Sequence, residues 1–383
     1  MASSTEKVHI LHRRPLTEIA DELGRRFAER APAFDDTDTF CEDNYVDLKQ
    51  AGLIEAGVPS ELGGGGATTD ELAGMLRTIG RYCGSTALAF SMHTHQVAIP
   101  AWRWRHQKAP VDALLKRIAA ERIILLSSGG SDWIAGSGKA EKVEGGYRIT
   151  ARKIFSSGSP LGSLLMTTAM YEEPGQEPMV LHFGIPMNSP QVRIDPVWKT
   201  MGMRATGSHD IIIDGHVVPE AAVALKRKAG EWHPLFQTIA TIAFPLIYSA
   251  YLGVAEGARD VAIDLAKKRR KDTHLFELAG RMDTELRAAR YAQRAMLDAI
   301  NENAPSAKSV NEVMAGRTLV ARHAIAAVEL AMETAGGQSF FRDRGLERRF
   351  RDIQGARYHP MQTGPQAEYA GRMALGEPVD KTF

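Results

Sequence analysis

The chain has 383 residues, of which 44% are hydrophobic and 24% charged, a composition typical of a globular protein with a sizeable core. Forty-seven basic residues balance 46 acidic ones, so no net charge would attract nucleic acid or an anionic membrane. The two cysteines, Cys41 and Cys83, are too few for a disulfide framework. These features predict a cytoplasmic protein that binds neither nucleic acid nor membranes.

The first third of the chain has a helical pattern. From about Leu16 to Ala120, apolar residues recur at three- and four-residue steps. The segment "GVPSELGGGGATTD", residues 57–70, interrupts this pattern with four consecutive glycines, and Thr69 or Asp70 is expected to cap the helix that follows. The N-terminus lacks the apolar region of a secretory signal.

The middle of the chain is rich in β-forming residues. From about Arg122 to Leu225, short runs such as "RIILLS" and "MVLHFGIP" alternate with Gly, Pro, Asn and Asp clusters. This spacing predicts an antiparallel sheet or barrel. The segment "EKVEGGYRITARK" predicts a hairpin that turns at Gly145 and Gly146.

From about Trp232 the pattern is helical again and predicts a bundle. Its most apolar window, residues 236–258, contains Pro245 and Glu256, which favours a buried helix over a membrane span. The predicted domains are therefore residues 1–121, 122–228 and 229–383. The predicted bundle helices are Phe236–Arg270, Thr273–Asn301, Val310–Ala335 and Leu346–Arg357.

Two loops in the β-rich region could hold a cofactor. "LLSSGGSDW", residues 125–133, exposes backbone N–H groups and hydroxyls that suit a polar ring edge or an anion, although a plain turn would look the same. In "KIFSSGSP", residues 153–160, Phe155 could pack on a flat aromatic cofactor while Ser156 or Ser157 donates a hydrogen bond. A strand that runs into a turn is the simpler interpretation.

Two helical segments are also candidates. In "ETAGGQSFFRDRG", residues 333–345, Gly336 and Gly337 fit either a helix C-cap or a close approach to a pyrophosphate. In "FSMHTHQVAIPAWRWRH", residues 90–106, His93 and His95 cannot share one helix face, and either could be a core residue. The chain has no Walker loop, Rossmann fingerprint, HExxH or G-x-S-x-G motif, and no metal site is expected.

In this order, the segments resemble the acyl-CoA dehydrogenase superfamily from about Thr37 to Gly376. "SSGGSD" is similar to the family's T-E-P-x-x-G-S-D without its Thr-Glu-Pro, and "KIFSSG" is similar to K-x-W-I-T-N. "WKTMGMRATGSHDIIIDGHVVPEA", residues 198–221, matches the signature around K-x-G-M-R-x-S and is the most specific similarity. "ETAGGQS" lies where the family has Q-x-x-G-G-x-G, with Glu333 and Ser339 as departures.

The resemblance implies a mainly α fold with a β-domain: an N-terminal helical domain, a middle antiparallel β-domain and a C-terminal four-helix bundle, assembled as a homotetramer. It implies a flavin, FAD or FMN, between the β-domain and the bundle. The residues that would hold the flavin are Ser127, Ser128, Phe155, Ser156, Ser157, Arg270, Gly336 and Gly337. Ser131, Arg204 and Tyr248 would lie near the substrate.

The resemblance also singles out His359. The dehydrogenases end the motif R-D-x-x-x-x-x-I-Y-E-G with the glutamate that removes the substrate's α-proton, whereas "RDIQGARYHP" places Tyr358 and His359 there. The second position at which dehydrogenases keep this base, near residues 243–245, holds no proton-transfer group. An imidazole titrates near neutrality without help, which favours the flavin monooxygenases of this fold, including dibenzothiophene monooxygenases and nitrososynthases.

Such enzymes take reduced flavin from a separate reductase, bind O2 and form a C4a-(hydro)peroxyflavin that oxygenates a small hydrophobic molecule. His359, His93 and Ser157 are the predicted catalytic residues, with His95 as the alternative to His93. Two other functions stay open. One is an FAD-dependent acyl-CoA dehydrogenase that acts on an acyl-thioester with histidine as its base, and the other is a non-catalytic binding protein on the same fold.

Overall fold

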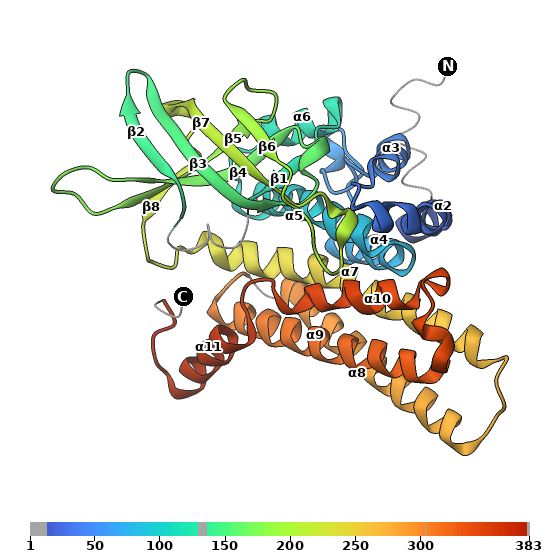
Figure 1. The fold of residues 1–383 in the computed structure, drawn as a ribbon. Coiled ribbons are helices and arrows are strands. Elements are labelled where there is room, and N and C mark those ends of the chain that lie inside the picture. Colours follow the sequence, from blue (N-terminus) through green and yellow to red (C-terminus); the bar gives the residue numbers. More distant parts are fainter. Residues whose placement is uncertain (1–13, 129–135, 303, 381–383) are drawn as a thin grey trace.

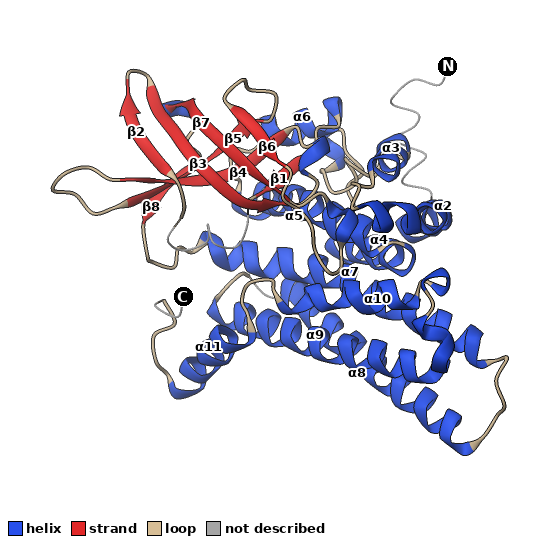
Figure 2. Cartoon of the chain, in the orientation of Figure 1, coloured by secondary structure: helices blue, strands red, loops and turns tan. Residues whose placement is uncertain are grey.

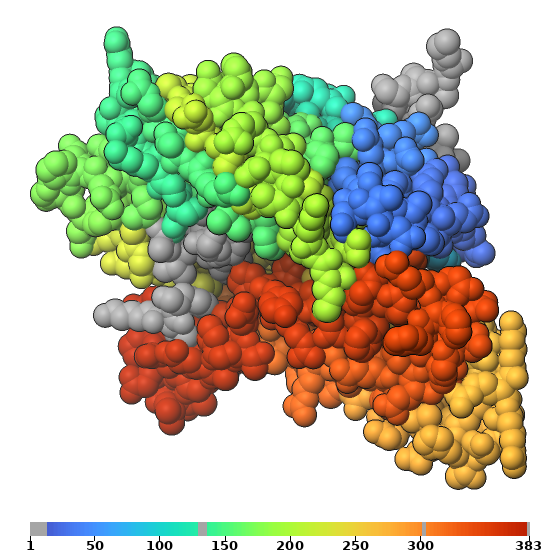
Figure 3. Space-filling view, in the orientation of Figure 1, coloured from blue at the N-terminus to red at the C-terminus, as the bar shows by residue number. Residues whose placement is uncertain are grey.

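The computed structural model describes residues 14–128, 136–302 and 304–380 (Figure 1). Helices occupy the first third of the chain, strands the middle and helices the last part, as Figure 2 shows by colour. The β-domain and the N-terminal helices lie side by side above the C-terminal helices. Figure 3 shows these two layers meeting along a seam that crosses the molecule.

The N-terminal helices follow the predicted pattern closely. The helix after the glycine-rich segment, α4, begins with a capping box in which the Thr68 side chain accepts from the backbone N–H of Glu71. The cap is therefore one residue earlier than Thr69, because the glutamate three residues on completes the box. The helices are α2 (Leu16–Thr37), α3 (Glu42–Gln50), α4 (Thr69–Tyr82), α5 (Gly84–Gln107) and α6 (Asp112–Glu121).

The β-domain is an eight-stranded sheet in the order β6-β7-β3-β2-β4-β5-β8, with β1 paired to β4. Most pairs are antiparallel as predicted, but β1 and β2 both run parallel to β4, so the sheet is mixed. The strands are β1 (Leu125–Ser127), β2 (Lys139–Val143), β3 (Gly146–Ser156), β4 (Leu164–Tyr171), β5 (Met179–Pro186), β6 (Val192–Asp195), β7 (His209–Pro219) and β8 (Leu225–Lys228).

The predicted hairpin is formed by β2 and β3, with a register that shifts its turn by one residue. Val143 pairs with Gly146, so the turn consists of Glu144 and Gly145. Gly145 has φ +78°, which a residue with a Cβ would adopt only at a cost. Gly146 already belongs to the strand, and a Cβ there would collide with the Val218 carbonyl oxygen of β7.

The C-terminal part contains α7 (Leu235–Ala266), α8 (Thr273–Glu302), α9 (Ala307–Ala335), α10 (Leu346–Ile353) and α11 (Thr363–Leu375). Helix α7 runs between the two layers in Figure 1 and packs on α4 and α5 above and on α8 and α9 below. Its apolar stretch has the length of a membrane span, but 94% of that window is buried inside the fold. One continuous hydrophobic core therefore joins the N-terminal helices to the bundle.

Helices α4 and α7 cross at a contact between glycines. A Cβ on Gly253 would collide with the Arg77 carbonyl oxygen and lie 2.9 Å from the Gly80 Cα. A Cβ on Gly80 would in turn collide with the Ala250 carbonyl oxygen. Because each helix meets backbone of the other, neither can yield by changing a rotamer, and the close packing of the two layers depends on these glycines.

We expect Gly253→Ala to reduce the free energy of unfolding by about 2–3 kcal/mol, since overpacking of a rigid contact costs this much. Chemical denaturation of both proteins measures it. Gly280→Ala on α8 is the matched control, because a Cβ there meets nothing within 4 Å and alanine in an exposed helix is favourable by up to about 1 kcal/mol. Equal stability of Gly253→Ala and the parent protein would contradict this account of the crossing.

Candidate functional site

His359 lies in a short loop after α10 and the 3-10 turn Gln354–Arg357, where it faces α7. Its Nε2 is 2.8 Å from the Tyr251 hydroxyl, and the rings of Tyr248 and Tyr251 pack edge-on against it, with centroids 6.2 and 5.5 Å away. Nδ1 has no hydrogen-bond partner in the described part of the chain. Burial lowers the pKa of His359 to about 3, aided by the charges of Arg317 and His95. His359 is therefore a neutral imidazole at pH 7.

His93 has a structural role that excludes the predicted catalytic one. It is 1% exposed, its Nδ1 accepts from the Leu125 backbone N–H at 3.0 Å, and its Nε2 donates to the Ile54 carbonyl at 2.9 Å. Both ring nitrogens are thus used to join α5 to the start of β1 and to the loop after α3. The prediction of His93 as a catalytic residue is wrong, because no nitrogen remains for a cofactor or substrate.

His95 is the predicted alternative to His93 and uses one ring nitrogen for a backbone contact. Its Nδ1 donates to the Ser91 carbonyl at 2.9 Å, so in the neutral ring Nε2 is an acceptor. Burial lowers the pKa of His95 to about 4. A proton on His95 would lower the pKa of His359 further, so the two rings are close enough to interact. Two neutral imidazoles, one from α5 and one from the loop after α10, therefore form the titratable part of the site, with the Tyr251 hydroxyl bound to one of them.

The predicted serine cradle forms where β1 and β3 end. Ser156 donates to the Ser127 carbonyl at 3.1 Å, and Ser127 donates to the Ser128 carbonyl at 3.2 Å. Thr167 of β4 donates to the Ser128 hydroxyl at 3.0 Å. These bonds hold the two strand ends together and place Ser127, Ser128 and Ser156 next to one another, while their role in binding a flavin stays a prediction. Ser131 lies outside the described residues.

Ser157 is the first member of a buried chain of hydroxyls. Its Oγ lies 2.8 Å from the Ser208 Oγ, which lies 2.6 Å from the Thr206 Oγ1. Thr206 donates to the Met203 carbonyl at 2.9 Å. Because a hydroxyl has one proton, Ser208 then donates to Thr206, and Ser157 donates to Ser208. The Ser157 oxygen keeps its lone pairs and acts as a hydrogen-bond acceptor.

An apolar surface borders this cradle. Phe155 is 41% exposed and packs against Trp198 with ring centroids 4.9 Å apart, while Ile154, Val197 and Met201 around them are also exposed. Large apolar side chains grouped on a surface usually mark a binding site. An aromatic face next to serine hydroxyls and an acceptor oxygen fits the isoalloxazine ring of a flavin, which is flat, apolar on its faces and polar at its edge.

Asp352 on α10 joins the two halves of the site. Its Oδ1 accepts from the Met203 backbone N–H at 2.5 Å, and the neighbouring Arg351 donates to the Met201 carbonyl at 2.8 Å. The loop that carries Trp198 and leads to Ser208 is therefore fixed to the helix that leads to His359. Burial raises the pKa of Asp352 to about 6.

Two other predicted residues are bound within the protein. Arg204 forms an ion pair with Asp38 at 2.6 Å, which ties the signature loop to the end of α2. Tyr248 is fully buried and donates to the Ala356 carbonyl at 2.7 Å. These contacts are structural, and the roles of both residues toward a substrate stay predictions. Arg270 is exposed, and the residue at the double glycine is Arg269.

The double glycine ends α9 and is only partly open to a ligand. Gly336 has φ +68°, and a Cβ there would lie 3.1 Å from the Arg269 guanidinium carbon. Arg269 donates to the Thr334 carbonyl at 2.7 Å, so it caps the helix end. Gly337 has nothing within 4 Å of its Cβ position and stays a candidate contact.

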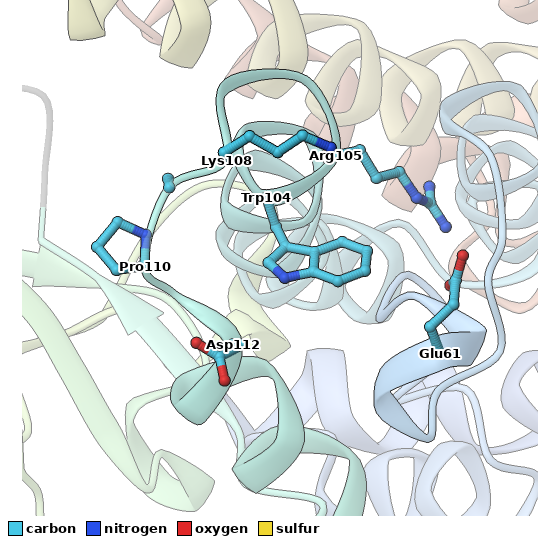
Figure 4. Close-up of a pocket in the computed structure, with 7 residues that line it drawn as sticks. Glu61, Trp104, Arg105, Lys108, Pro110 and Asp112 are labelled. Carbon is cyan, nitrogen blue, oxygen red and sulfur yellow. The ribbon is translucent and has the colours of Figure 1, made fainter.

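A separate pocket of about 500 Å³ lies at the end of α5 (Figure 4). Arg105 and Lys108 line it together with the carboxylates of Glu61 and Asp112, and the Trp104 ring lies between them in Figure 4. None of the residues discussed above lines it, and its mixed charges favour neither an anion nor a cation.

The comparisons with known proteins agree with the predicted family. Residues 12–111 match the acyl-CoA dehydrogenase N-terminal domain, and residues 246–363 match the acyl-CoA dehydrogenase C-terminal domain. A pigment production hydroxylase from Rhodococcus is 26% identical over 95% of this chain and 97% of its own length. An amino sugar nitrososynthase from Streptomyces peucetius is 25% identical over 86% and 85%.

Solved structures confirm the predicted fold. KijD3 in complex with FMN and a dTDP-linked amino sugar has a TM-score of 0.87 at 23% identity, over 96% of this chain and 95% of that one. FMN-bound TdsC from Paenibacillus has a TM-score of 0.84 at 18% identity, over 96% and 99%.

The buried histidines make a prediction about stability and pH. The pKa of His93 falls from 6.5 in the unfolded chain to about 4 in the fold, so between these values the unfolded state binds the extra proton. Acid should therefore destabilise the protein over this range, by about 1.4 kcal/mol per pH unit for each such histidine.

We expect His93→Gln to reduce this pH dependence by the contribution of one proton, whatever its effect on stability at pH 7. His95→Gln should do the same, and the double variant should lose both contributions. Urea denaturation at several pH values gives the slopes. An unchanged slope in His93→Gln would show that His93 is protonated in the folded protein.

Proposed function

The chain belongs to the acyl-CoA dehydrogenase superfamily, and from this premise we propose that it is a flavin-dependent monooxygenase that oxygenates a small hydrophobic molecule. The observation that carries the proposal is the neutral imidazole of His359 in the position of the dehydrogenase carboxylate. A carboxylate there would remove an α-proton, whereas His359, Tyr251 and His95 can exchange protons with oxygen species. The hydroxylase and nitrososynthase relatives support this preference.

The residues fit a flavin in its reduced form. Phe155 and Trp198 offer an aromatic face, and Ser127, Ser128 and Ser156 offer polar groups at its edge. The Ser157 oxygen is an acceptor, and reduced flavin carries an N–H donor at N5 where oxidised flavin has an acceptor. Bound reduced flavin, delivered by a separate reductase, supplies two electrons for the activation of O2.

The overall reaction balances with these components. One oxygen atom of O2 enters the substrate, and the other leaves as water with two protons and the two electrons of the reduced flavin. His359 can donate a hydrogen bond to an oxygen species from Nδ1, which has no partner among the described residues, while the Tyr251 hydroxyl fixes the ring through Nε2. His95 Nε2 is an acceptor.

His359→Ala tests the proposal directly. Reduced FMN-loaded protein is mixed with O2, and hydrogen peroxide is measured over time. We expect His359→Ala and His95→Ala to release hydrogen peroxide at least about tenfold faster than the parent protein, since each variant loses a hydrogen bond to the bound oxygen species that is worth about 1.5–3 kcal/mol. His323→Ala on α9, whose side chain pairs with Glu285, is the control and should behave as the parent does.

A second arm separates the two oxidoreductase classes. The oxidised FMN- or FAD-loaded protein is mixed anaerobically with acyl-CoAs, and the flavin absorbance is followed. Bleaching that depends on His359, together with hydrogen peroxide release that does not, would make the protein an acyl-CoA dehydrogenase with a histidine base. The homotetramer and the cytoplasmic location stay predictions, which size measurement and cell fractionation can test.

Ser208→Ala tests the direction of the hydroxyl chain. Without Ser208, the Ser157 proton is free to point toward the flavin, so the preference for the reduced form should fall. If the hydrogen bond that favours reduced FMN contributes about 1 kcal/mol, its loss changes the ratio of the dissociation constants of reduced and oxidised FMN roughly fivefold. Anaerobic and aerobic FMN titrations measure both constants, and Ser189→Ala on the exposed loop before β6 is the control.

A further inference from the structure

We propose that Arg317 of α9 is the positioning residue of this site: it holds the loop that carries His359 and places a permanent positive charge beside the imidazole. The inference rests on the proposed function only where turnover is measured. No pattern in the sequence distinguishes this arginine from the others on the helix.

The Arg317 side chain binds the backbone of the loop that carries His359. One guanidinium nitrogen, Nη2, donates to three carbonyl oxygens, those of Ala356 at 3.2 Å, Arg357 at 3.3 Å and His359 at 2.8 Å. Tyr248 donates to the same Ala356 carbonyl, and the guanidinium carbon lies 5.2 Å from the Tyr248 ring centre. A planar guanidinium can converge several donors on one turn of chain in a way that a lysine ammonium cannot.

The charge of Arg317 has no carboxylate partner in the described part of the chain. The residue is 1% exposed, and its Nε is buried without a hydrogen-bond acceptor. Burying a guanidinium in this way is costly, because carbonyl dipoles and an aromatic face replace both water and a counter-ion. An arginine that served only to hold the loop would be stabilised by a nearby aspartate or glutamate. The unpaired charge acts on His359, whose backbone carbonyl it binds.

The groups that face His359 are Arg317 from α9, His95 from α5, and Tyr248 and Tyr251 from α7. None of them is anionic at neutral pH, since burial raises the pKa of both tyrosines well above its usual range. Arg317 is the one permanent charge in this set, and it disfavours the imidazolium. It therefore adds to the effect of burial, which is the main cause of the lowered pKa of His359, while the carbonyl contacts keep the ring turned toward Tyr251.

The parent protein gives the first test, which needs no variant that might misfold. Histidine labelled with carbon-13 is incorporated, and the His359 signal, identified by its loss in His359→Asn, is followed by NMR with the protein free of flavin. We expect His359 to stay neutral throughout the range from about pH 5 to 8 in which a free imidazole changes charge. A His359 titration centred near 6.5 would overturn the proposal.

Arg317→Met then removes the charge and the donors, and Arg317→Lys keeps the charge alone. We expect the pKa of His359 to be higher in Arg317→Met than in the parent and unchanged in Arg317→Lys. The exposed Arg322, on the same helix, gives the matched control Arg322→Met, which should leave the His359 titration as in the parent. Equal His359 titrations in folded Arg317→Met and in the parent would overturn the proposal.

Turnover adds a second readout. In Arg317→Met the acidic limb of the pH profile should move to higher pH, and in Arg317→Lys the limb should stay while kcat falls by about tenfold or more because the loop is less well held. If the chain proves to be a dehydrogenase, the NMR result stands unchanged, so failure of the proposed function and failure of the Arg317 proposal are distinguishable.

Discussion

The hydrogen bond from the Met203 backbone N–H to the buried Asp352 carboxylate is the link on which the site depends. Met203 belongs to the β-domain loop that contains Trp198 and leads to Ser208, and Asp352 lies on α10, seven residues before His359. The aromatic face and His359 belong to separate layers, and this bond, with the neighbouring one from Arg351 to the Met201 carbonyl, joins them. The raised pKa of Asp352 shows the cost of the arrangement, and because its folded pKa lies above the unfolded one, this cost grows as pH rises through about 6.

Electrostatically, the site combines neutral bases with a fixed cation. His93, His95 and His359 are all kept neutral by burial, but only His95 and His359 keep a ring nitrogen that is not bound to backbone. The positive charge of Arg317 favours a group that is neutral at pH 7 at this position, which an imidazole of lowered pKa is. An imidazole at this position and the neighbouring charge of Arg317 are therefore consistent with each other.

Much of the fold could be predicted from the sequence, because the hydrophobic period changes cleanly from helix to strand and back. The four-residue strands β6 and β8 are too short to give a period, and α11 begins with Pro365 in its first turn, where proline is tolerated but reads as a break. The parallel pairing of β1 and β2 with β4 depends on how distant strands assemble, which local patterns do not encode. The joining of the N-terminal helices and the bundle into one core depends in the same way on α7 being buried on every side.

The site was predictable only where a residue's role follows from its type and position. His359, Phe155 and the serines were found because a motif placed them, whereas the choice between His93 and His95 depends on which side of α5 faces β1 and which faces the loop after α10. Two residues two apart on a helix point in different directions, and the Leu125 and Ile54 contacts that engage His93 come from distant parts of the chain. Arg317 shows the same limit more sharply. A buried arginine is recognisable by the carbonyls that surround it, and these come from a loop 39–42 residues further along the chain.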